Sequence, residues 1–124
     1  MYILKMNIWW SLEVIRGPKM PIHKSWVDID SKGREYKVDV MINTSHDLIK
    51  YLDGIKCVFR ALREKQAGTG EFQLVLLVDN HDPFGYHFHD KLPGQHNSRK
   101  SISAKNWKEA WHAFKTKLER IYYE

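Results

Sequence analysis

The chain has 124 residues, enough for one hydrophobic core and too few for two ordinary domains. Its 43% hydrophobic content excludes an intrinsically disordered chain. The formal net charge of +5 favours phosphate-rich partners, above all nucleic acid. No apolar run approaches the ~20 residues of a membrane span, and the single cysteine, Cys57, cannot form an internal disulfide. We therefore predict one basic domain, residues 1–124, located in the cytoplasm and without a membrane partner.

Alternating apolar residues predict the first elements. Every even-numbered residue from Tyr2 to Val14 is apolar, which is typical of a long β-strand over residues 2–15 with one buried face. A hairpin is predicted next, with the arms Lys24–Asp30 and Arg34–Ile42. Gly33 supplies the positive φ that its tight turn requires.

The middle of the chain is predicted to form a short helix and a second hairpin. Thr44 would cap the helix, whose buried side would contain Leu48, Tyr51 and Leu52. Residues Ile55–Glu64 fit either a continuation of that helix or a strand, and Gly54 favours the strand. Cys57 would then be packed inside it. The arm Glu71–Val78 is almost entirely apolar, which is typical of a central strand covered on both faces.

Alternation returns in the segment Phe84–His89. Its aromatic residues are predicted to be buried on one face, which leaves His87 and His89 together on the opposite, solvent-exposed face. The chain ends in an amphipathic helix capped by Ser103, with an apolar stripe of Trp107, Trp111, Phe114, Leu118 and Ile121. The predicted fold class is α+β: a single domain with a twisted, mainly antiparallel sheet and the C-terminal helix packed across one face.

The candidate catalytic residues are two histidines on this strand, the histidine before it and a nearby carboxylate: His87, His89, His81 and Asp79. Imidazole titrates near neutrality, so one ring can take a proton from a ribose 2′-hydroxyl while another protonates the leaving 5′-oxygen. This acid–base mechanism on a phosphodiester needs no metal or other cofactor. It is the preferred hypothesis from the residues alone.

The segment after the histidines is basic, and cationic side chains stabilise the charge that builds on phosphorus. The predicted nucleic-acid-binding residues are Lys91, His96, Arg99, Lys100 and Lys105. Two alternatives remain open. A His-x-His pair on a strand is also a common pair of metal ligands, which would indicate a metal-dependent hydrolase. The same basic face could instead belong to a non-catalytic module that binds nucleic acid or an acidic protein.

The block Asp79-Asn80, followed by Gly85, His87 and His89, resembles the Asp-Asn…Gly-x-His-x-His block of the TumE-type toxins. These small proteins belong to bacterial and archaeal toxin–antitoxin modules. The resemblance implies a toxin that acts on RNA and is neutralised by a helix-turn-helix antitoxin, and it leaves a homodimer open. Val78 stands where the family usually has an aromatic residue.

Overall fold

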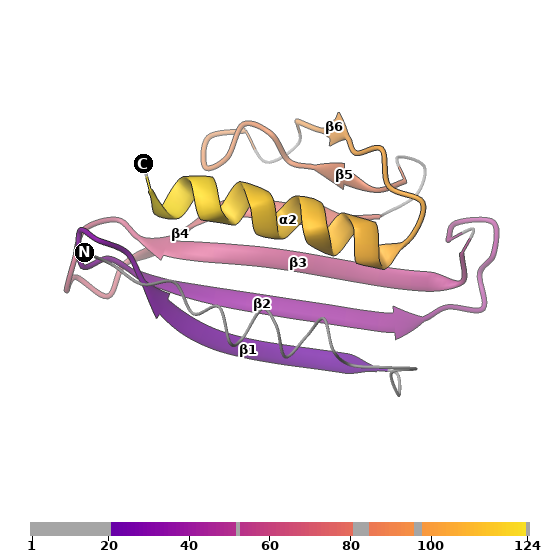
Figure 1. Ribbon diagram of the computed structural model, residues 1–124, viewed down its shortest axis with the longest axis horizontal. Helices are drawn as coiled ribbons and strands as arrows, with labels where there is room; N and C mark the ends of the chain where they lie inside the picture. Colours follow the sequence, from indigo (N-terminus) through magenta and orange to yellow (C-terminus); the bar gives the residue numbers. More distant parts are fainter. Residues whose placement is uncertain (1–20, 52, 81–84, 96–97, 124) are drawn as a thin grey trace.

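The computed structural model describes residues 21–51, 53–80, 85–95 and 98–123, and in them six strands form one sheet in chain order (Figure 1). All neighbouring strands are antiparallel. They are β1 (Ile22–Ile29), β2 (Glu35–Thr44), β3 (Ile55–Glu64), β4 (Phe72–Asp79), β5 (His87–Phe88) and β6 (Lys100–Ser101). One helix, α2 (Trp107–Tyr122), crosses a face of the sheet. The predicted α+β class is confirmed, whereas the strand predicted over residues 2–15 lies outside the described residues.

Both predicted hairpins are present. β1 pairs with β2, and the turn between them contains Gly33 at φ 79°, which a residue with a Cβ rarely adopts. β3 pairs with β4, which decides the ambiguous segment after Gly54 in favour of a strand. A β-bulge interrupts this second ladder between Ala61 and Leu62.

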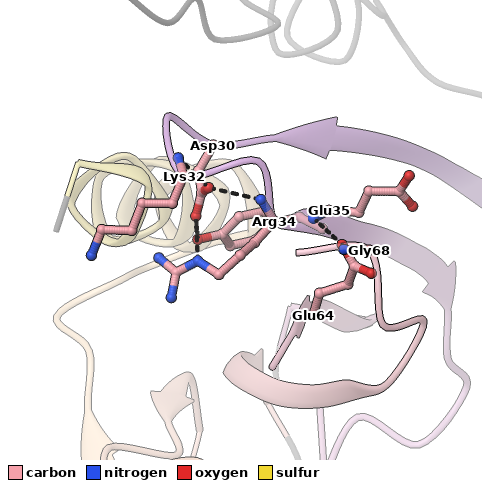
Figure 2. A network of polar contacts seen from close by, with 7 residues as sticks. Asp30, Lys32, Arg34, Glu35, Glu64 and Gly68 are labelled. Atoms are coloured by element: carbon pink, nitrogen blue, oxygen red, sulfur yellow. Dashed lines mark hydrogen bonds and ion pairs between the residues drawn. The ribbon is translucent and has the colours of Figure 1, made fainter. Parts of the chain in front are cut away.

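A buried carboxylate organises the first hairpin turn. Asp30 accepts hydrogen bonds from the backbone N–H groups of Lys32 and Arg34, from Nε of Arg34 at 2.9 Å and from the Tyr36 hydroxyl at 2.9 Å (Figure 2). Burial alone would raise the pKa of Asp30, but these hydrogen bonds together hold it below its ordinary value. Burial and the bond to Asp30 raise the pKa of Tyr36 to about 12.

A second buried carboxylate joins the two hairpins. Glu64 accepts hydrogen bonds from the backbone N–H groups of Glu35 on β2 and of Gly68 in the β3–β4 turn (Figure 2). It accepts a further bond from the N–H of Gly70 in the same turn. The bond from Glu35 is the main cause that lowers the pKa of Glu64. The turn of the second hairpin is therefore tied to the start of β2, the second strand of the first hairpin.

The hydrophobic core lies between α2 and the sheet. The α2 face of β2 presents Tyr36, Val38, Val40 and Ile42, all at most 1% exposed. Trp111 is 2% exposed and makes edge-to-face contacts with Trp26 and Phe59. At the other end of α2, the Tyr122 hydroxyl donates to Asp28 at 2.9 Å. Cys57 is buried in this core, and burial raises the pKa of its thiol, which agrees with a packing role.

The start of α2 differs from the predicted one. The helix begins at Trp107 and its N-cap is Asn106, whose side chain accepts from the N–H of Glu109, so the prediction of Ser103 as the cap is wrong. The Glu109 carboxylate in turn accepts from the N–H of Lys105, so two side chains cap backbone donors at the start of the helix. In the predicted stripe, Ile121 is only half-buried, while the other four residues are buried.

The prediction of a short helix after Thr44 is wrong. Thr44 is the last residue of β2, and the segment that follows consists of turns. The Asp47 carboxylate accepts from the N–H groups of Ile49 and Lys50 and so stabilises a local turn. Leu48 is 60% exposed, and Tyr51 is the buried apolar residue of this loop among those described. A helix this short has little intrinsic stability without a core-facing stripe.

The predicted burial of β4 on both faces is also wrong in part. Leu76 and Val78 are buried under α2, but Val75 and Leu77 are only partly buried.

Within the described ranges, no helix is long and apolar enough to cross a membrane.

Candidate functional site

The candidate centre is built where β4 ends beside β5. Val78 faces Phe88, and Asp79 faces His87, across this ladder. Val78 is buried under α2, so Phe88 projects toward the helix, while Asp79 and His87 project from the opposite face. On its other side, β5 pairs with β6, where His87 stands opposite Ser101.

Three polar side chains converge at this point. Nε2 of His87 lies 2.8 Å from Oδ1 of Asp79, and Nε2 of His89 lies 3.3 Å from Oδ2 of the same carboxylate. The two imidazole rings have centroids 5.1 Å apart. His87 and His89, predicted to lie on one side of the strand, both contact Asp79, which bridges them.

The predicted exposure of the two histidines is wrong. His87 is 1% exposed and His89 is 9% exposed, whereas Tyr86 and Phe88, predicted to be buried, are only half-buried. Phe84 lies outside the described residues. β5 runs inside the sheet between β4 and β6, so the side chains of both neighbouring strands flank those of β5. Burial holds both rings in one orientation, which is the condition for a defined polar centre.

The hydrogen bonds of His87 restrict where its protons are. Nδ1 of His87 lies 2.7 Å from the carbonyl oxygen of Gly85, which can only accept, so Nδ1 carries a hydrogen and donates it. Nε2 then faces a carboxyl oxygen of Asp79 at 2.8 Å. The two atoms are at ion-pair distance but are not aligned as a hydrogen bond, so the contact is electrostatic and suits a positive charge at Nε2 or an ion beside it.

The second residue of the Asp-Asn pair has a structural role that the sequence did not reveal. Asn80 is 4% exposed; its Oδ1 accepts from the N–H of Cys57 at 3.0 Å, and its Nδ2 donates to the carbonyl of Ile55 at 2.7 Å. The side chain thus takes the place of the next backbone unit in the β3–β4 ladder. This bond pair fixes the end of β4, and with it the position of Asp79.

A tyrosine connects the centre to the β2–β3 loop. The Tyr86 hydroxyl donates to Oδ2 of Asp53 at 2.6 Å. Burial, together with this bond, raises the pKa of Tyr86. The residue before His87 is therefore fixed to a different loop, which restricts the movement of β5.

The predicted cationic residues are spread around β5 and β6. Lys91, Arg99, Lys100 and Lys105 are all exposed. Lys100 stands opposite Phe88 in the ladder, so it projects toward the α2 face rather than toward Asp79. Lys91 forms an isolated bridge with Gln95 in the loop after β5. His81 and His96, predicted as catalytic and nucleic-acid-binding residues, lie outside the described residues.

The same three side chains have the composition of a metal site. Asp79, His87 and His89 each offer a ligand atom, and these atoms all lie within 4.8 Å of one another. Two imidazoles and one carboxylate suit zinc or another divalent transition metal. Metal-bound histidines commonly donate their second N–H to a backbone carbonyl, as His87 does to Gly85. The geometry therefore accommodates either a shared proton or a metal ion.

Comparison of the chain with models of protein families, with curated proteins and with solved structures finds no match.

Proposed function

We propose that this protein is the RNA-cleaving toxin of a toxin–antitoxin module and that Asp79, His87 and His89 form its reactive centre. The single observation that carries the proposal is the convergence of two buried imidazoles on one carboxylate, at 2.8 and 3.3 Å. Buried titratable groups that contact each other are concentrated at functional sites. The resemblance of the Asp79–His89 block to the TumE-type toxins supports the toxin assignment.

The proposed reaction is transfer of the phosphodiester to the neighbouring 2′-oxygen. A base removes the proton of the 2′-hydroxyl, the 2′-oxygen bonds to phosphorus, and the bond from phosphorus to the 5′-oxygen breaks. An acid protonates the leaving 5′-oxygen. The products are a 2′,3′-cyclic phosphate and a free 5′-hydroxyl, so no water is consumed in this step.

Exposure assigns different roles to the two histidines. The side chains of His89 and Asp79 are 9% and 17% exposed, so they are the members of the centre that RNA can approach. His87 is 1% exposed; its Nδ1 is hydrogen-bonded to the Gly85 carbonyl, and its Nε2 lies 2.8 Å from Oδ1 of Asp79, so it acts as a positioning residue for Asp79. The exposed cations Lys91 and Arg99 would hold the RNA backbone nearby.

The test is expression of the chain in cells that lack the antitoxin, together with cleavage of RNA by the purified protein. The wild-type chain should arrest growth. His89→Ala and Asp79→Asn should relieve the arrest and slow cleavage by about 10²–10⁴, the usual contribution of positioned proton transfer. His112→Ala, an exposed histidine on α2, is the matched control and should remain toxic.

Two results would overturn this proposal. If the purified protein binds RNA but leaves it uncut, or if the Asp79 and His89 variants stay as toxic as the wild type, the chain is a non-catalytic binding module. The partner of such a module would be RNA or the acidic surface of a protein, and binding would again depend on the exposed cations.

A metal-dependent hydrolase is the second candidate, and the three ligand atoms within 4.8 Å favour it. Asp79, His87 and His89 would hold the ion, which would supply an activated water and polarise the phosphate. A chelator separates the two mechanisms. Cleavage that persists in chelator supports proton transfer by the side chains, whereas cleavage that stops and returns with added zinc supports the metal-dependent hydrolase.

A further inference from the structure

A cavity of about 210 Å³ adjoins the centre. It lies between the C-terminal half of α2, which contributes Lys117 and Ile121, and the segment that follows β5. The volume is below that of pockets for drug-sized molecules, so the cavity can enclose only part of a larger ligand, the rest of which would remain in solvent. Two cations, one carboxylate and several apolar residues form its walls.

The first cation is Arg63 on β3. The Arg63 side chain is half-buried, and its Nε is a buried donor that has no hydrogen-bond partner among the described residues. A buried donor without an acceptor is costly, and a guanidinium matches the geometry of phosphate oxygens. The Arg63 side chain also hydrogen-bonds with that of Tyr36, so an anion in the cavity would bind the remaining N–H groups of the guanidinium.

The second cation is Lys117 on α2. Its Nζ lies 5.2 Å from the centroid of the Phe88 ring, within the range of a cation–π contact. This contact turns the ammonium toward β5 and the cavity instead of outward into solvent. Phe88 stands between His87 and His89 in the chain, so Lys117 is anchored to the strand that carries the centre.

The rest of the lining suits the uncharged part of a nucleotide. Val75, Leu76, Leu92, Pro93 and Ile121 form an apolar wall. Asp90 is exposed and lines the cavity, and the Ser98 hydroxyl donates to it at 2.8 Å. This bond is the main cause that lowers the pKa of Asp90. Its negative charge opposes an anion and keeps the cavity from being a strong site for phosphate alone.

His89 belongs to both features: it lines the cavity, and its Nε2 contacts Asp79. We propose that the cavity binds one nucleotide of the RNA chain next to the bond that is cleaved, with its phosphate at Arg63 and Lys117 and its base or ribose on the apolar wall. The inference rests on the proposed function, because it assigns the RNA substrate of that centre a fixed position.

In the experiment, the full chain is titrated with adenosine 3′-monophosphate and calorimetry measures the binding. Lys117→Gln should weaken binding roughly tenfold, because it removes one charge-assisted contact to phosphate. Asp90→Asn should tighten binding, since it removes the opposing charge. The control is Lys108→Gln, which makes the same charge change on the first turn of α2, where Lys108 also lies over a ring, 5.8 Å from the centroid of Trp107. This variant should bind like the wild type.

Nuclear magnetic resonance spectra of the protein locate the ligand. The nucleotide should shift the ring signals of His89 and Phe88 and leave those of His23 on β1 unchanged. The inference is overturned if these signals do not move, if Lys108→Gln loses as much affinity as Lys117→Gln, or if inorganic phosphate binds as tightly as the nucleotide.

Failure of this inference can be distinguished from failure of the proposed function. If the protein cleaves RNA and Lys117→Gln leaves KM and kcat unchanged, the cavity is not a subsite, although the centre is a nuclease. If the nucleotide binds in the cavity and the protein does not cut RNA, the cavity stands as a nucleotide site and the nuclease proposal fails.

Discussion

Asp79 and His87 are direct partners in the β4–β5 ladder, and their side chains meet at 2.8 Å on the face opposite α2. The preceding pair, Val78 and Phe88, leaves the sheet on the α2 side. One step along the ladder thus separates packing residues from polar ones. A slip of β5 by one residue would turn the His87 imidazole toward the helix while Asp79 stayed on the opposite face, so register is what assembles the centre.

The first prediction concerns the packing of α2. Trp111→Ala should lower the free energy of unfolding by about 3–5 kcal/mol, because a large ring at 2% exposure leaves a cavity that cannot collapse fully. Urea denaturation of the two proteins measures the difference. His112→Ala, the exposed neighbour on the same helix, should change stability little. Equal stability of Trp111→Ala and the wild type would show that the helix contributes little to the core.

The second prediction concerns Asn80. Asn80→Ala removes the acceptor for the Cys57 N–H and the donor for the Ile55 carbonyl. Each buried group left unpaired should destabilise the protein by roughly 1–3 kcal/mol. Thermal unfolding gives the comparison, with exposed Asn43→Ala as the control. An Asn80→Ala protein that melts with the wild type would contradict the role of Asn80 as an extension of the ladder.

The sequence predicted the sheet and α2 because each element there has a strong period. In β2, every second residue from Tyr36 to Ile42 is apolar and buried, and α2 has its apolar residues on one side. Those patterns report burial against one large surface, so they determine which face points inward. His87 and His89 could also be grouped from the sequence, because spacing of two on a strand places side chains on one side. The contacts of Asp79 with them depend on the pairing of β4 with β5.

The burial of the histidines could not be predicted in the same way. β5 has only two residues, too few to show a period, and its second neighbour, β6, is equally short. The contacts of Asn80 and of Tyr86 with Asp53 join residues 25 and 33 positions apart, and no local pattern encodes them. The turns after Thr44 have a similar origin, because Asp47 satisfies backbone donors locally and so competes with a helix.

The third prediction concerns acid stability. The pKa of Asp30 is lowered in the folded protein, so its contribution to stability is present above the unfolded pKa and is lost as the pH falls through the folded one. Asp30→Asn should therefore destabilise the protein at pH 7 and make its stability less dependent on pH below about 4. Urea midpoints across pH 2–7 provide the test. Exposed Glu35→Gln on β2 should keep the acid dependence of the wild type.

The fourth prediction concerns the exposed cations after β5. Lys91→Ala and Arg99→Ala should each weaken RNA binding and reduce the slope of log K against log salt by roughly 0.7, the expected value for one lost phosphate contact on a single strand. Lys24→Ala supplies the control, since this exposed lysine lies on β1 at the opposite edge of the described sheet. The slope is read from binding isotherms at several salt concentrations.

The slope separates a local contact from the general attraction of a basic protein for RNA. A side chain that touches phosphate releases condensed counterions, so its removal changes the slope, whereas distant charges act mainly through screened attraction. If Lys24→Ala lowers the slope as much as Lys91→Ala does, the attraction comes from the net charge and the RNA has no fixed path past β5. If only the Lys91 and Arg99 variants lower it while cleavage of bound RNA proceeds at the wild-type rate, these residues hold the substrate and Asp79 and His89 perform the chemistry.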